Sequence, residues 1–369
     1  MSWALHDPVH GAYGSGRLRV GPRGDFATSP SLGPQFAALV APQIAQWLQQ
    51  LPGRRLSLIE AGPGEGDLAA DLARELVAGW PDLSRQLELV LIEPNAGMAR
   101  RQRQRLDDCP LPRRWASFAD LAAAPVEGVL LAHEVLDALA VARVQWDGTH
   151  WRRQLVVLDE AGSAGLALRL ESGEPLDPQA DAAEWRQLQL RGLLAEHTLP
   201  SGWTTEIHTA VAPWLADAAA ALGQGVLLVV DYALESRRYN LASRAEGTLI
   251  AYRDQQASGD PLRDPGHWDL TAHLCLETFE ADARACGWQP LGQRLQGEAL
   301  LALGLAQRLH GLQQCPPDRL AEALAAREAL LRLVDPAGLG AFRWIALERP
   351  ADRRIKASLF LSDQPEDRR

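Results

Sequence analysis

The sequence predicts an α/β fold in which helices cover both faces of a doubly wound parallel sheet. The first observation is a series of short, continuous apolar runs, which are typical of strands buried on both faces. The second is that amphipathic stretches of helical period separate these runs, and such alternation implies parallel pairing through right-handed crossovers. The strand candidates are Leu56–Gly62, Leu87–Glu93, Gly128–Glu134 and Gly225–Tyr232, and the first helical stretches are Asp67–Trp80 and Ala96–Leu106.

Two regions interrupt this rhythm. Alternating residues on either side of Asp147–Gly148 predict a hairpin with a two-residue turn, so we expect residues 141–200 to be an inserted, partly antiparallel subdomain. Residues 234–275 have the Gly, Pro and Asp content of loops. Residues 51–140 and 201–369 are then the core with helical additions, which include the helices Gly297–Gln313 and Asp318–Val334 and a closing strand at Phe342–Glu348.

Residues 1–50 predict a loop and a helix that precede the core. Ser29 and Pro30 are typical of a cap and a first helical position, so we expect a helix at Leu32–Leu48. Asp269 has two interpretations: it caps a helix at Thr271–Cys286, or it lines the substrate side of a site together with Thr271 and His273.

The composition excludes several classes of protein. With 37 Lys and Arg against 47 Asp and Glu, the net charge is −10, which argues against nucleic-acid binding because that binding needs clustered cations. No apolar run is long enough to predict a membrane span, and we expect no targeting peptide in the first residues. The four scattered cysteines predict reduced thiols in a cytoplasmic protein, with no metal site. Most of the twelve tryptophans, including Trp47 and Trp214, are interpreted as core residues.

The strongest chemical signal is a glycine turn at the end of the first strand, Glu60-Ala61-Gly62-Pro63-Gly64-Glu65-Gly66. Glycine permits positive φ and lets a ligand lie against bare backbone, and the following helix points its free N–H groups at that ligand. The spacing G-x-G-x-G differs from the G-x-G-x-x-G that fits a dinucleotide. The competing interpretation is a tight strand-to-helix turn with solvated acids.

Two carboxylates extend this signal. Glu93 ends the second strand, where an acid can accept the hydroxyl groups of a ribose, and Glu60 can face a cationic amino-acid group. Together with the turn, these acids resemble the S-adenosylmethionine (SAM) site of class I methyltransferases. The predicted cofactor contacts of this region are Glu60, Gly62, Pro63, Gly64, Gly66 and Glu93.

Several motifs are spread along nearly the whole chain: Gly24–Pro30, Glu60–Gly66, His133–Leu139, Asp231-Tyr232, Gly247–Leu249, Asp260-Pro261, Asp269–His273 and Gln296-Gly297. Together they resemble one family, the MidA-like (DUF185) methyltransferases. The resemblance implies a Rossmann-like fold, SAM as cofactor, and relatedness to mitochondrial complex I assembly factors described as protein-arginine methyltransferases. It implies that the loop and helix of residues 1–50 cover the cofactor site, with further cofactor contacts at Thr28, Ser29 and His133 in this chain. It also implies a protein substrate, such as a subunit of a complex I-like assembly. The chain departs from the family pattern at Ser31, His133, Ala140 and Ala233.

A methyltransferase that acts on arginine needs carboxylates, because a guanidinium is a poor, delocalised nucleophile. Glu134 and Asp137 lie just beyond a strand end and would converge if a helix begins there. The resemblance makes them the catalytic candidates; helix capping and solvation are the alternative. His273 is a third candidate, as a proton acceptor, because an imidazole titrates near neutrality. A structural role for His273 is equally compatible with the sequence.

Three functions therefore compete. The first is a SAM-dependent methyltransferase that modifies protein arginine, and the second is a non-catalytic assembly factor with a SAM-binding fold. The third is a nucleotide-dependent oxidoreductase, which the glycine spacing disfavours.

Overall fold

The computed structural model describes residues 1–159, 167–194, 199–349, 355 and 358–362. Its centre is a seven-stranded sheet with the order β15-β16-β9-β4-β1-β2-β3. The strands β4, β1, β2, β3 and β9 are parallel, whereas β16 runs antiparallel to both β9 and β15. Their bounds are β1 Leu56–Ala61, β2 Leu87–Ile92, β3 Arg113–Trp115, β4 Val126–His133, β9 Leu222–Asp231, β15 Gln289–Leu295 and β16 Arg343–Arg349.

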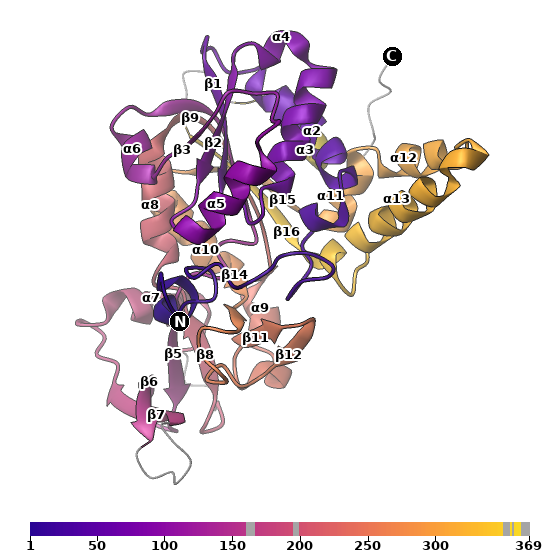
Figure 1. Cartoon of the computed structure of the whole chain (residues 1–369). Coiled ribbons are helices and arrows are strands. Elements are labelled where there is room, and N and C mark those ends of the chain that lie inside the picture. The colour runs from indigo at the N-terminus through magenta and orange to yellow at the C-terminus, as the bar shows by residue number, and fades with distance from the viewer. Residues whose placement is uncertain (160–166, 195–198, 350–354, 356–357, 363–369) are drawn as a thin grey trace.

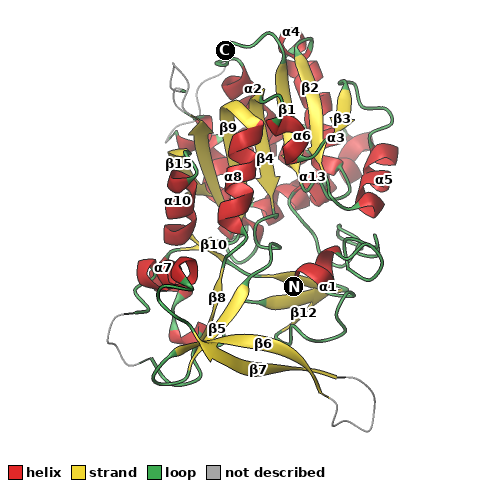
Figure 2. Ribbon diagram, turned by 90° about the vertical axis from the view of Figure 1, so that its left-hand side faces the viewer, coloured by secondary structure: helices red, strands yellow, loops and turns green. Residues whose placement is uncertain are grey.

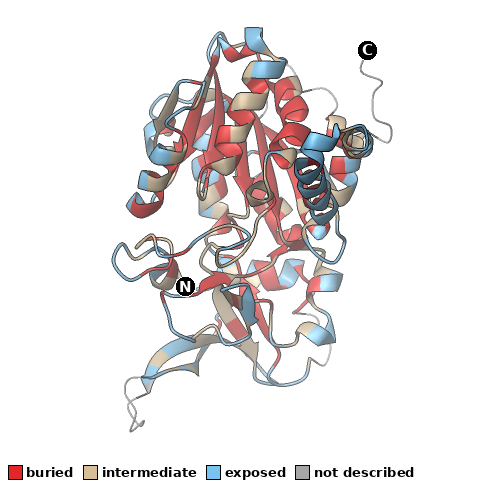
Figure 3. Cartoon of the chain, turned by 45° about the vertical axis from the view of Figure 1, so that its right-hand side comes forward, coloured by how far each residue is buried: buried red, intermediate tan, exposed pale blue. Residues whose placement is uncertain are grey.

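Helices cover both faces of this sheet, as predicted (Figures 1 and 2). Alternate residues of β1 enter opposite layers: Leu58 packs into the cluster beneath α2 and α3, and Ile59 into the cluster beneath α8 and α10. The sheet is accordingly buried between two helical layers, whereas α12 and α13 lie at the exposed periphery (Figure 3). The helices are α1 Ser2–His6, α2 Gln35–Leu48, α3 Asp67–Gly79, α4 Pro81–Ser84, α5 Ala96–Arg105, α6 Phe118–Ala122, α7 Ala182–Leu190, α8 Val211–Ala221, α9 Ser236–Tyr239, α10 Leu276–Ala285, α11 Gln296–Ala302, α12 Leu305–Leu312 and α13 Leu320–Leu333.

A second, four-stranded sheet with the order β7-β6-β5-β8 lies to one side of the core (Figure 2). The predicted hairpin is confirmed, since Trp146 pairs with Trp151, although residues 147–150 form a longer connection than two residues. The sheet draws β8 from residues after 200. Its strands are β5 Ala142–Trp146, β6 Trp151–Asp159, β7 Ala167–Pro175 and β8 Thr204–Ile207.

The region 234–275 is only partly loop. It forms a small sheet with the order β12-β11-β13 and a two-stranded pair of β10 with β14. Their bounds are β10 Ala233–Leu234, β11 Ile250–Arg253, β12 Gln256–Ser258, β13 Asp269–Thr271 and β14 Leu274–Cys275. None of the helices in the described ranges is long and apolar enough to cross a membrane.

Three helix predictions were wrong. Asp269 begins strand β13 and caps no helix, because α10 starts only at Leu276. Ser29 precedes a short 3-10 turn, and its hydroxyl group bonds to Gln296 and not to a helix N-terminus. The helix expected at Gly297–Gln313 breaks at Gly304, whose φ of 96° lies in the left-handed region that favours glycine.

Candidate active site

The carboxyl ends of β1, β2 and β4 lie side by side, with Ala61 in register with both Ile92 and Ala132. A cavity of about 820 Å³ opens at this edge, and a smaller one of about 70 Å³ adjoins it. Tyr13, Gly62, Gly64 and Glu134 line both cavities. Of the predicted cofactor contacts, Glu93 lines the larger cavity, and Glu60, Pro63, Thr28 and His133 line the smaller one.

The glycine turn leaves its backbone open to the cavities. Gly62, Gly64 and Gly66 have φ values of 62°, 55° and 88°, which side chains rarely adopt. A Cβ on Gly64 would have only Val20 Cγ2 near it, at 3.9 Å, so the space in front of this backbone is free for a ligand. Gly66 lines neither cavity and instead precedes α3 in a left-handed conformation.

Glu93 is held rigidly on the cavity wall. Its carboxylate accepts hydrogen bonds from the backbone N–H and side-chain amide of Asn95, at 2.8 and 2.9 Å, and from Gln102 Nε2 at 2.9 Å. The same Gln102 amide donates to the carbonyl oxygen of Gly64 at 2.9 Å, which ties the acid to the glycine turn. Burial raises the pKa of Glu93 while these donors lower it. A fixed acceptor beside open backbone fits the hydroxyl groups of a ribose.

Glu60 is buried beside the turn, with only 4% of its surface exposed. Burial, and to a lesser degree the charge of Asp67, raises its pKa to about 8. Among the described residues, its Oε2 atom has no hydrogen-bond partner. An unpaired buried carboxyl oxygen fits a cationic amine, so the acid, the open glycine turn and Glu93 together match the parts of SAM.

Apolar and aromatic side chains complete the wall of the larger cavity. Trp115, Phe118 and Trp214 line it, and the rings of Phe118 and Trp214 meet edge to face at 5.4 Å. Trp47 is fully buried as predicted, whereas Trp214 packs against the core but is only partly buried and also lines this cavity. His6 and Tyr13 of the N-terminal segment also line it. Sequence reasoning missed both residues; the loop expected over the site was the only signal.

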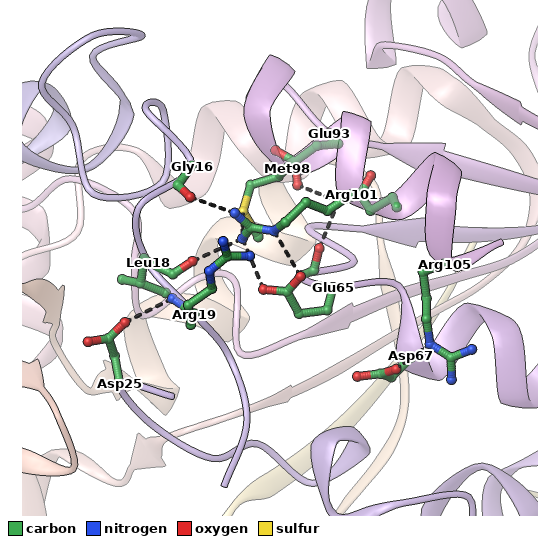
Figure 4. Close-up of polar contacts among 12 residues, drawn as sticks. Gly16, Leu18, Arg19, Asp25, Glu65, Asp67, Glu93, Met98, Arg101 and Arg105 are labelled. Atoms are coloured by element: carbon green, nitrogen blue, oxygen red, sulfur yellow. Dashed lines mark hydrogen bonds and ion pairs between the residues drawn. The ribbon is translucent and has the colours of Figure 1, made fainter. Parts of the chain in front are cut away.

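An arginine that the sequence analysis did not single out binds the N-terminal segment to the glycine turn (Figure 4). Arg101 pairs with Glu65 through two contacts of 2.9 Å. Its guanidinium also donates to the carbonyl oxygens of Gly16 and Leu18, at 2.6 and 2.9 Å. The loop predicted to fold over the cofactor site is thus anchored to the turn itself.

Glu134 and Asp137 lie beyond the end of β4, as predicted, but in an irregular turn and not in a helix. Glu134 has a φ of 53°, and the carboxylate of Asp231 holds the turn by accepting the backbone N–H groups of Val135, Leu136 and Asp137 at 3.3, 3.0 and 3.3 Å. The capping interpretation of both acids was therefore wrong. Asp231 is a residue whose role the sequence did not reveal.

This turn gathers buried carboxyl groups, to which Asp269 is added from β13. Burial and the charges of the neighbouring acids raise the pKa values of Glu134 and Asp137 well above the usual range, and burial raises that of Asp231 to about 7. Among the described residues, Oε1 of Glu134 and Oδ1 of Asp137 have no hydrogen-bond partner. Such a cluster attracts a cation, because a positive charge would satisfy the free oxygens and offset the repulsion between the acids.

Ser29 supports this cluster. Its side chain is fully buried against Gln296 and lines neither cavity, while its backbone N–H donates to the carboxyl group of Glu134. A direct side-chain contact of Ser29 with the cofactor stays a prediction that this geometry does not favour.

The two predicted histidines have different surroundings. His133 lies next to the cluster, with Nδ1 3.4 Å from Oε1 of Glu134, and burial lowers its pKa to about 3, so the ring is neutral. His273 lines neither cavity; its ring lies 5.4 Å from that of Tyr232, and burial lowers its pKa to about 4. The structure does not bring His273 to the carboxyl cluster as a proton acceptor. Within the described residues, no group of His, Cys, Asp and Glu could hold a metal ion.

Comparisons with known proteins agree with this geometry. A family model described as "Putative S-adenosyl-L-methionine-dependent methyltransferase" matches residues 39–294. The protein arginine methyltransferase NDUFAF7 homolog, mitochondrial, of Drosophila melanogaster is 27% identical over 94% of this chain and 80% of its own length. The protein arginine methyltransferase NDUFAF7, mitochondrial, of Danio rerio is 26% identical over 85% of this chain and 74% of its own length.

A solved structure is similar over almost the whole chain. It is a COG1565 superfamily member from Burkholderia thailandensis bound to S-adenosyl-homocysteine, with a TM-score of 0.82 and 29% identity over 99% of this chain and 90% of that one. A second crystal structure of a COG1565 superfamily protein from this organism gives a TM-score of 0.80 at 28% identity, over 99% of this chain and 89% of that one. The agreement extends beyond the central sheet to the added segments.

Proposed function

Because the chain belongs to the MidA-like family of SAM-dependent methyltransferases, we propose that it transfers a methyl group from SAM to an arginine nitrogen of a protein. The observation that carries the proposal is the buried carboxyl cluster beside the larger cavity, where one oxygen each of Glu134 and Asp137 has no hydrogen-bond partner in the described part of the chain. The relatives named as arginine methyltransferases support the same substrate.

Two groups of residues would do the chemistry, one on the cavity walls and one in the carboxyl cluster, where Glu134 lines both cavities and Asp137 neither. Glu60, Glu93 and the backbone of Gly62–Gly64 would hold SAM, which supplies an electrophilic methyl group on a positively charged sulfur. Glu134 and Asp137 would hold the guanidinium group of the substrate. Two carboxylates can grip the planar group through paired, charge-assisted hydrogen bonds and leave one nitrogen free to react.

The carboxylates would also change the reactivity of that nitrogen. Negative charges on one side of the guanidinium localise its positive charge, so the free nitrogen becomes a better nucleophile. Methylation removes one proton from the attacking nitrogen. The Glu134 carboxylate, which the bound guanidinium would keep charged until that step, can take up this proton because burial raises the pKa of this acid. The binding site would hold the attacking nitrogen close to the methyl carbon and in line for the displacement.

We also propose a class of protein substrate. The resemblance to complex I assembly factors supports a subunit of a respiratory-type complex as the substrate. The cytoplasmic location suggested by the cysteines stays a prediction.

The test is to incubate the protein with SAM labelled in its methyl group and a cell extract, hydrolyse the proteins and identify the labelled amino acids. We expect the label in methylarginine. Label in another amino acid would contradict arginine as the substrate, and no label in any protein would favour the non-catalytic assembly factor.

A matched variant separates catalysis from binding. Glu134→Gln keeps the size of the side chain but removes its charge, so methylarginine formation should fall by orders of magnitude. The affinity for SAM, measured by calorimetry, should change little. If the variant transfers methyl groups as fast as wild type, Glu134 has no catalytic role.

A further inference from the structure

Tyrosines surround the carboxyl cluster. The chain has only 4 tyrosines, and three of them, Tyr13, Tyr232 and Tyr252, approach the cluster from separate segments. The hydroxyl group of Tyr13 hydrogen-bonds to Asp269. Tyr252 on β11 pairs directly across the strands with Asp269 on β13. The three rings are therefore assembled at one place by the fold and not by proximity in sequence.

The acid that these tyrosines share is Asp137. Burial, together with the charge of Asp137, raises the pKa of Tyr13, Tyr232 and Tyr252 above the ordinary value, so each remains a neutral phenol. The ring of Tyr232 is fixed from the side, because it meets Phe342 edge to face at 4.1 Å. Neutral rings held around a carboxyl group form an environment for a cation.

The acids of the cluster are more deeply buried than the three tyrosines. Asp137 is 3% exposed and the Glu134 side chain 9%, and each has an unpartnered oxygen within the described chain. The three tyrosines are only half-buried. The tyrosines are therefore more exposed than the acids that they approach, and Tyr13 lines both cavities.

We propose that Tyr13, Tyr232 and Tyr252 flank the side chain of the substrate and select a guanidinium group over an ammonium group. Carboxylates alone attract both cations. A guanidinium is flat, delocalised and weakly hydrated, so it stacks on aromatic faces, whereas an ammonium is compact and strongly hydrated. This inference rests on the proposed function and deepens it, since it assigns the choice of arginine over lysine to the three rings.

Tyr252 is the residue to change, because it lines neither cavity and so lies outside the proposed cofactor contacts. The test uses protein loaded with S-adenosyl-homocysteine, titrated with N-acetyl-arginine methylamide or N-acetyl-lysine methylamide. Wild type should bind the arginine probe more tightly. Tyr252→Leu should weaken binding of the arginine probe by about 2- to 30-fold, the range for loss of a cation–aromatic contact, and leave the lysine probe unchanged.

Tyr252→Phe is the matched control, since it keeps the ring and should bind like wild type. Unchanged affinity for S-adenosyl-homocysteine shows that each variant is folded, and Tyr252→Met replaces Tyr252→Leu if the latter fails this criterion. Equal binding of both probes to wild type, no binding of the arginine probe, or equal loss in Tyr252→Phe and Tyr252→Leu would overturn the inference. If wild type forms methylarginine while Tyr252→Leu binds the arginine probe normally, only the role of the tyrosines fails; absence of methylarginine refutes the proposed function itself.

Discussion

Arg101 and Glu65 form a double ion pair, in which Nε lies 2.9 Å from Oε2 and Nη2 lies 2.9 Å from Oε1 (Figure 4). Glu65 belongs to the glycine turn, and the same guanidinium binds the carbonyl oxygens of Gly16 and Leu18. The pair therefore connects the glycine turn to the N-terminal segment, and Gly64 of the turn and Tyr13 of the segment both line the two cavities. We therefore expect the position of the N-terminal segment and the affinity for the cofactor to depend on each other.

Arg101→Leu should loosen the N-terminal segment and weaken SAM binding. The free energy of unfolding should fall by about 1.5–3 kcal/mol, because the variant loses charge-assisted hydrogen bonds and leaves Glu65 without this partner. The loss is this large because the Arg101 side chain is only 17% exposed. Chemical unfolding, calorimetric titration with SAM and limited proteolysis near residues 14–24 measure the three effects. Arg114→Leu is the control, since its pair with Glu88 is more exposed and should contribute at most about 1 kcal/mol. Equal protease resistance of Arg101→Leu and wild type would argue against an anchoring role.

Gly64→Val should abolish SAM binding in a folded protein. The valine side chain would project into the space in front of the turn, where the nearest atom to its Cβ is Val20 Cγ2 at 3.9 Å. The positive φ of 55° adds backbone strain of about 1–2 kcal/mol. Gly192→Val is a matched control, because Gly192 has a φ of 71° and lines neither cavity, and no atom of the described residues lies within 4 Å of an added Cβ. Both variants should show a native circular dichroism spectrum, and normal SAM affinity of Gly64→Val would show that the site is misplaced.

Glu60 should make the stability of the cofactor-free protein depend on pH. Its pKa is raised to about 8 in the folded state, above the ordinary value of 4.5. Its stabilising contribution is therefore complete below about pH 4.5 and is lost as the pH rises through 8, by at most about 5 kcal/mol. Other buried acids also contribute, so the test compares the unfolding free energy of wild type and Glu60→Gln between pH 5 and 9. The difference between them should move in favour of the variant as the pH rises; a constant difference would refute the raised pKa.

The sequence predicted the parts of this fold that obey local rules. Apolar runs such as Leu87–Ile92 are buried on both faces, and a continuous hydrophobic pattern indicates such strands directly. The strand Arg113–Trp115 was missed, because it is a short, polar edge strand without that pattern. The caps expected at Ser29 and Asp269 were wrong for a different reason. Both side chains have tertiary partners far away in sequence, Gln296 and Tyr13, which outweigh a local preference.

The site was predictable only where it lies close to strand ends. Parallel strands end at one edge, so Gly62, Glu93 and Glu134 could be expected together. The irregular turn at Glu134 could not be foreseen, because it depends on Asp231 from a neighbouring strand. The tyrosines were missed because three separate segments bring them to the cluster.

Asp231→Asn should show that this turn positions the two acids proposed to be catalytic, Glu134 and Asp137. One carboxylate oxygen accepts three backbone N–H groups of residues 135–137, and the other accepts that of Tyr232 at 2.8 Å. An asparagine amide has a single acceptor oxygen, so its NH2 group would face at least one backbone N–H donor. That buried donor would lose its acceptor, at a cost of about 1–3 kcal/mol in stability. We expect turnover to fall while SAM affinity changes little.

The pH profile of the variant separates a purely structural role of Asp231 from an effect on the two acids, which a loss of stability alone does not. The charge of Asp231 raises the pKa values of Glu134 and Asp137, after the larger effect of burial on both. Its removal lowers these pKa values, so the acidic limb of the profile should move to lower pH. Methyl transfer measured from pH 5 to 9 checks this, and an unmoved acidic limb with reduced turnover would mean that Asp231 acts on folding alone.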